Sequence, residues 1–98
     1  EVFYVKAVYD GKVKEIKEDP IMGSIVEIIN SDSITTVYQS LSDVSVKVND
    51  NITQGKMIGL SSKNKIVDDY SLNFQVYKNG KLINPEEIYG KTIDELNE

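Results

Sequence analysis

The chain has 98 residues, a net charge of −5 and neither histidine nor cysteine. This length allows one compact domain, and the basic residues, all of them lysine and interspersed with acids, argue against a nucleic-acid surface, which needs clustered positive charge. Without imidazole or thiol, the sequence excludes Ser-His and Cys-His nucleophiles and any zinc site that depends on His or Cys.

The N-terminal half predicts short strands joined by turns. Residues 2–9 alternate loosely and end at Asp10-Gly11, a dipeptide typical of two-residue hairpin turns, so residues 13–16 are the expected partner strand. Lys12, Lys14 and Lys17 stand among acidic residues, as expected of a solvated edge strand. Three segments complete this half: a loop over 18–23, an apolar strand over 24–29 expected to be buried on both faces, and a strand over 34–38.

The C-terminal half continues the pattern. Val44, Val46 and Val48 alternate with polar residues, which predicts a half-buried strand. Asn79-Gly80 predicts a hairpin turn between strands over 72–77 and 81–83. Residues 92–98 begin with a capping-box pattern and predict a short helix. Roughly eight or nine short strands with Gly-marked turns indicate an all-β sandwich or barrel. We expect one domain over 1–98, with its core over about 5–89 and a tail over 90–98.

Five motifs in order carry a family resemblance: "VKAVYDGKV", "GSIVEI", "TTVYQSL", "VSVKVNDNITQGKMIG" and "YSLNFQVYKNGKLINP". Together they resemble the core of the LytM/lysostaphin-type zinc endopeptidases, which cut peptide bridges in bacterial cell walls. The resemblance implies an antiparallel sheet fold of the duplicated-hybrid-motif type.

The resemblance also implies which residues replace the family's histidines. Tyr38 and Leu41 match a Tyr-x-His-Leu motif in which Ser40 stands at the histidine. Ser71 and Asn73 stand at a His-x-His motif, whose first histidine assists catalysis and whose second binds zinc in the family. The family's remaining ligands, a His and an Asp, would precede residue 1.

The chemistry of these substitutions argues against hydrolysis. A catalytic zinc needs about three His or carboxylate ligands and an open position for water. Asn73 offers a neutral amide, and neither Ser40 nor Ser71 can act as a general base in place of His. We therefore expect no enzyme activity, no catalytic residue, no cofactor and no metal. The replaced positions are expected to converge on one cleft and to leave a binding groove formed by Tyr38, Ser40, Tyr70, Ser71 and Asn73.

The function implied by the resemblance is recognition. Non-catalytic, SpoIIQ-type members of the family serve in sporulation, so we expect a protein-interaction domain in a bacterial cell-envelope or sporulation-channel assembly. Its partner would be another protein of that assembly, and a membrane anchor upstream of this chain would hold it outside the cytoplasm. The alternative is a module that binds peptidoglycan without cleaving it. A third hypothesis is that the domain is a spacer or cap within a larger chain.

Other sites fit the sequence less well. A biotinyl or lipoyl carrier would present its lysine at a tight turn, whereas Lys56 follows Gly55 and enters the next strand. Solvated loop acids explain the candidate calcium ligands, and no spacing supports a glycosidase pair. The acids considered were Asp43, Asp50, Asp68 and Asp69 for calcium, and Glu27, Glu86 and Glu87 for the glycosidase pair.

Overall fold

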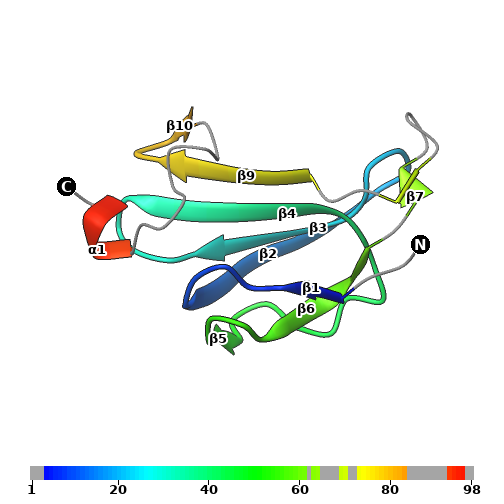
Figure 1. Ribbon diagram of the computed structural model, residues 1–98, viewed down its shortest axis with the longest axis horizontal. Helices are drawn as coiled ribbons and strands as arrows, with labels where there is room; N and C mark the ends of the chain where they lie inside the picture. The colour runs from blue at the N-terminus through cyan, green and yellow to red at the C-terminus, as the bar shows by residue number, and fades with distance from the viewer. Residues whose placement is uncertain (1–3, 62, 65–68, 71–72, 84–92, 97–98) are drawn as a thin grey trace.

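The computed structural model describes residues 4–61, 63–64, 69–70, 73–83 and 93–96. Among these residues, eight strands form one antiparallel sheet, ordered β1-β6-β4-β3-β2-β5, with β9 also beside β4 and β10 beside β9 (Figure 1). The predicted all-β antiparallel fold is confirmed. The strands are β1 (Tyr4–Lys6), β2 (Gly11–Asp19), β3 (Gly23–Ile29), β4 (Ile34–Ser42), β5 (Asn51–Ile52), β6 (Met57–Ser61), β9 (Asn73–Lys78) and β10 (Lys81–Ile83).

Three short elements lie outside this sheet. β7 (Lys63–Asn64) and β8 (Asp69–Tyr70) pair with each other in a separate two-stranded ladder. A single helical turn, α1 (Ile93–Leu96), falls inside the segment predicted as a helix. In the described part of the chain, no helix has the length and apolar character that crossing a bilayer requires.

Alternation along the strands gives the sheet two different faces. On β3, Val26 and Ile28 are fully buried, whereas Ile29 is 42% exposed. The register places Ile28 beside Thr36 of β4, which is also fully buried. Because neighbours across a ladder share a face, these residues define an inner face. We call the other side the open face; it carries Glu27, Ile29, Thr35, Tyr77 and Leu82.

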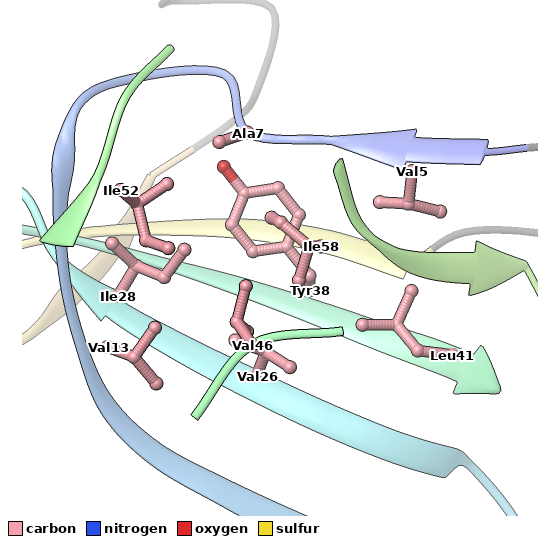
Figure 2. Packing of buried hydrophobic residues seen from close by; sticks show 10 residues of the cluster. All are labelled: Val5, Ala7, Val13, Val26, Ile28, Tyr38, Leu41, Val46, Ile52 and Ile58. Carbon is pink, nitrogen blue, oxygen red and sulfur yellow. The ribbon is translucent and has the colours of Figure 1, made fainter. Parts of the chain in front are cut away.

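The inner face carries the main core. In Figure 2, β1 and β6 lie over strands β2 to β4, and the side chains of both layers meet between them. Complete burial of such an aliphatic side chain contributes roughly 1.5–3 kcal/mol, so this cluster is the main stabilising contact between the layers. Its buried members are Val5, Ala7, Val13, Val26, Ile28, Tyr38, Leu41, Val46, Ile52 and Ile58.

The predicted hairpin at Asp10-Gly11 is wrong. β1 pairs with β6, with Tyr4 opposite Leu60, while β2 pairs with β3 and β5. Glycine is needed at position 11 for another reason: a Cβ there would lie 2.5 Å from Ile28 Cγ2. The residue allows close packing of backbone against a neighbouring strand, a role that a turn-like dipeptide does not reveal.

Two further strand predictions need correction. The segment over 24–29 is not buried on both faces, since β3 alternates between buried and partly exposed side chains. The predicted strand at Val44 to Val48 forms no ladder, although Val46 is buried. Its backbone bonds go to two strands, because Ser45 N donates to Ile58 O at 2.8 Å and Asn49 N donates to Val13 O at 2.8 Å.

The hairpin turn at Asn79-Gly80 is confirmed. β9 and β10 pair on either side of it, with Lys78 opposite Lys81. Asn79 and Gly80 have φ values of 52° and 79°, and a type I′ turn needs positive φ at both central positions. The turn therefore fixes the register of β10 and the position of Leu82 on the open face.

Candidate functional site

Ser40 lies where β4 changes neighbours. Residues before it pair with β9, ending with Gln39 opposite Asn73, and residues after it pair with β6, starting with Leu41 opposite Ser61. The register with β3 shifts at the same place, and Ser40 has a φ of 63°. An inserted residue with an unusual backbone conformation bends a strand and is frequent beside functional sites.

Tyr38 lies on the inner face and anchors this bend to the core. Its side chain is fully buried, and its ring centroid is 5.2 Å from that of Phe74. Its hydroxyl accepts a hydrogen bond from Val8 N at 2.9 Å. Burial raises the pKa of the Tyr38 hydroxyl above its usual value, and the bond from Val8 partly opposes that rise.

The residues predicted to form the groove lie on different strands, and one of them lies outside the described residues. The backbone of Asn73 lies one register position from Ser40, so the two replaced positions are neighbours across the β4–β9 ladder. Tyr70 belongs to β8, opposite Lys63, and Ser71 lies outside the described residues. Tyr38 and Ser40 have no exposed area and therefore add no surface to a groove in this structure. Convergence of Ser40, Ser71 and Asn73 on one cleft stays a prediction.

The donors at these positions do not suit the zinc that the family resemblance implies. Ser40 and Asn73 offer a hydroxyl and a neutral amide, and the sequence contains no histidine or cysteine. Among the described residues, no three acidic side chains come close enough to hold a metal ion. Zinc requires imidazole, thiolate or carboxylate ligands, so no step of hydrolysis can be assigned to this chain.

A pocket on the open face lies away from the predicted groove. It has a volume of about 200 Å³ and is lined by Lys14, Glu27, Thr35, Tyr77 and Gly80. The cross-strand register places Tyr77 opposite Thr35, and Glu27 opposite Val37, two positions further along β4. Four strands and a hairpin turn thus contribute to this pocket, which sequence reasoning missed because no local pattern joins these residues.

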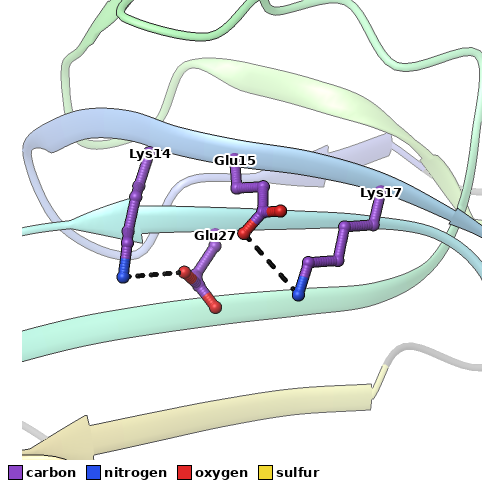
Figure 3. A network of polar contacts seen from close by, with 4 residues as sticks. All are labelled: Lys14, Glu15, Lys17 and Glu27. Atoms are coloured by element: carbon purple, nitrogen blue, oxygen red, sulfur yellow. Dashed lines mark ion pairs between the residues drawn. The ribbon is translucent and has the colours of Figure 1, made fainter.

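The charged rim of this pocket belongs to a small network (Figure 3). Lys14 Nζ lies 3.4 Å from Glu27 Oε2, and Lys17 Nζ lies 3.6 Å from Glu15 Oε2. Glu15 is the direct cross-strand partner of Glu27, so two carboxylates face each other and the two lysines offset their repulsion. The register of β2 shifts between Val13 and Glu15, where Lys14 is the extra residue. The sequence prediction of a solvated strand with mixed charge agrees with these contacts.

Similarity to known proteins extends along almost the whole chain. It is 36% identical, over 96 residues, to stage II sporulation protein Q of Bacillus subtilis (strain 168), a match that covers 96% of this chain and 34% of that protein. The chain therefore spans about a third of the length of this curated relative.

Solved structures show the same relationship. A chain in the structure of the SpoIIQ–SpoIIIAH pore-forming complex matches with a TM-score of 0.92 and 34% identity, covering 100% of this chain and 63% of that one. The catalytic domain of lysostaphin from Staphylococcus simulans matches with a TM-score of 0.76 and 27% identity, covering 87% of this chain and 68% of that one. The fold is therefore shared with the catalytic domain of an antimicrobial peptidase and with a chain of a pore-forming complex.

The model of one family, peptidase family M23, matches residues 3–85. This range includes the bend at Ser40, the β4–β9 ladder and the hairpin at Asn79-Gly80. Together with the identity to stage II sporulation protein Q, it accounts for the order of motifs along the sequence. The chain belongs to peptidase family M23.

Proposed function

We propose that this domain is a non-catalytic member of the family that binds another protein in a sporulation assembly of the bacterial cell envelope. The observation that carries the proposal is the similarity to stage II sporulation protein Q, together with the 0.92 TM-score to a chain from the SpoIIQ–SpoIIIAH complex. The proposal places the domain outside the cytoplasm, held by a membrane anchor upstream of this chain.

The absence of catalysis rests on side-chain chemistry. Activation of a zinc-bound water, or removal of its proton, needs ligands and a base that histidine supplies in this type of enzyme. No histidine occurs in the 98 residues, and Ser40, Ser71 and Asn73 stand at the replaced positions. A scaffold that keeps its sheet while losing these groups retains surfaces that bind, and the fold alone does not require hydrolysis.

Titration calorimetry with the SpoIIIAH homologue of the same organism tests the protein-binding role. We expect saturable binding with one partner per domain, and heat-denatured domain serves as the control. Absence of measurable heat and of a mass increase in light scattering would contradict the proposal. Addition of zinc should change neither the affinity nor the stoichiometry, because no donor set for the metal is present.

A second candidate is a peptidoglycan-binding module that does not cleave. It is favoured by the structural match to the catalytic domain of lysostaphin and by the neighbouring backbone positions of Ser40 and Asn73. Titration with cell-wall muropeptides, followed by amide chemical shifts, separates the two functions. Saturable shifts at Tyr70, Ser71 and Asn73, without binding of the SpoIIIAH homologue, would favour this candidate over the protein-binding role.

A further inference from the structure

The open face presents a row of partly exposed side chains across four strands. The register places Leu82 opposite Tyr77, Tyr77 opposite Thr35, and Thr35 opposite Ile29. Leu82 and Ile29 are 58% and 42% exposed. The pocket of about 200 Å³ is lined by Thr35 and Tyr77 of this row together with Lys14, Glu27 and Gly80. Its volume is below the roughly 300–1,000 Å³ of small-molecule sites, and it therefore suits one side chain of a larger partner.

The chemistry of the pocket selects a cation. Glu27 contributes a carboxylate whose side chain is only 25% exposed, and Glu15 stands directly opposite it on β2. The chain as a whole carries a net charge of −5, which attracts basic partners over longer distances. Lys14 and Lys17 pair with these two carboxylates in the free protein, so a positive group from outside would bind by replacing Lys14 at Glu27.

The aromatic wall distinguishes a guanidinium from an ammonium group. Tyr77 lines the pocket, and its hydroxyl donates to Gln75 Oε1 at 3.2 Å. A planar guanidinium can stack on such a ring while it donates two parallel hydrogen bonds to a carboxylate, whereas an ammonium group cannot do both. Gly80 leaves the mouth open, since a Cβ built there meets no atom within 4 Å.

From these contacts we propose that the pocket between Glu27 and Tyr77 on the open face binds an arginine side chain of the partner protein. The inference rests on the proposed protein-binding function and names the chemistry that the partner must present. The guanidinium would bond to the Glu27 carboxylate and stack on Tyr77, and the flanking Ile29 and Leu82 would contact apolar groups on either side of the arginine.

Lys14 forms an ion pair with the Glu27 carboxylate in the free protein. Its Nζ lies 3.4 Å from Glu27 Oε2, longer than the 2.7–2.9 Å of a strong charge-assisted bond, and its side chain is 55% exposed. Exposed pairs of this kind contribute little to stability, so an incoming arginine displaces the lysine easily. Lys14 is thus a competitor for Glu27, and its removal should strengthen binding.

The probe is N-acetyl-arginine methylamide, titrated into the full chain and followed by amide chemical shifts. We expect saturable shifts at Thr35, Tyr77 and Gly80, loss of at least about tenfold in affinity for Glu27→Gln, and tighter binding for Lys14→Met. Asp43→Asn is the matched control for the lost negative charge, because Asp43 is exposed, follows the far end of β4 and has a φ of 47° that asparagine tolerates. Lys47→Met is the matched control for the lost lysine.

Several results would overturn the inference. These are equal binding of the uncharged analogue N-acetyl-citrulline methylamide, preference for N-acetyl-lysine methylamide, no saturable shift, or equal effects of Glu27→Gln and Asp43→Asn. The experiments distinguish an error in the arginine-binding pocket from an error in the proposed protein-binding function. Equal affinity of wild type and Glu27→Gln for the SpoIIIAH homologue refutes the pocket alone, whereas arginine binding without any binding of that protein refutes the protein-binding role alone.

Discussion

At Tyr38, one hydroxyl group joins the core to the segment that follows β1. The oxygen accepts the bond from Val8 N at 2.9 Å, and the ring around it is fully buried among the side chains of the inner face. The Val8 N–H is partly buried, so a variant that removes its acceptor leaves this donor only partly able to bond to water, at a cost in free energy. The hydroxyl also has a side-chain hydrogen bond with Thr36, so it joins the segment after β1 to the core and to β4.

We predict that Tyr38→Phe lowers the free energy of unfolding by about 1–2 kcal/mol, because Val8 N–H loses its acceptor while the ring still fills the core. Urea denaturation measures the loss. Tyr77→Phe is the matched control: it removes a hydroxyl that bonds Gln75 on the open face, and it should cost less than about 0.5 kcal/mol. Equal losses for the two variants would contradict this view of Tyr38.

Asp19 has a comparable role at the turn between β2 and β3. Its Oδ1 accepts backbone N–H bonds from Met22 and Ile21, each at 2.8 Å. These bonds, that from Met22 most strongly, lower the pKa of the Asp19 carboxyl below its usual value. Because the folded state has the lower pKa, the stabilising effect is present above the unfolded-state pKa and is lost as pH falls through the folded-state pKa.

We therefore predict that acidification lowers the melting temperature of the wild type more than that of Asp19→Asn. Asparagine keeps an acceptor oxygen for the turn but carries no charge to titrate, so the part of the acid destabilisation that comes from Asp19 disappears. Thermal unfolding followed by circular dichroism from neutral pH to below the folded-state pKa measures this difference. Parallel curves for the two proteins would show that the turn does not contribute to the pH dependence.

At the scale of elements, the close contact of β2 with β3 depends on the missing side chain of Gly11. A Cβ at this position would lie 2.5 Å from Ile28 Cγ2 and 2.6 Å from Ile29 O. The second of these atoms belongs to the backbone and cannot rotate away. The two strands must therefore separate locally if any other residue occupies position 11.

We predict that Gly11→Ala destabilises the protein by about 1–3 kcal/mol, the range for overpacked sites. Asn51→Ala is the control, because Asn51 is exposed on β5 and pairs with Lys12 of β2. This variant should change stability by less than about 0.5 kcal/mol. Chemical denaturation of both variants provides the comparison. A neutral Gly11→Ala would mean that the strands are not held this closely in solution.

Local chemistry explains which elements the sequence predicts correctly. The Asn79-Gly80 turn follows from two residues with positive φ, whereas the pairing of β1 with β6 joins opposite halves of the chain and leaves no local pattern. The sequence resemblance identified Ser40 and Asn73, which the register makes neighbours. The resemblance could not locate the pocket on the open face, because the residues that line the pocket come from four strands and a turn. In addition, the place of Lys14 depends on a register shift in β2.

At the scale of the whole molecule, one sheet separates two kinds of surface. The inner face holds the main core between β1, β6 and strands β2 to β4, whereas the open face carries the charged network, the pocket and partly exposed apolar side chains. A net charge of −5 together with such a face is consistent with the proposed recognition of a basic partner, because binding needs complementary charge and shape.

Amide hydrogen exchange of the domain, alone and with the SpoIIIAH homologue, tests the central claim most directly, because it reports binding by the domain and the surface that binds. The account predicts slower exchange in the complex over β9, β10 and the turn at Asn79-Gly80, where the open face and its pocket lie, and little change in β5 or in the segment around Val46. Identical exchange rates with and without the partner throughout the chain would contradict the claim that this domain acts by protein recognition.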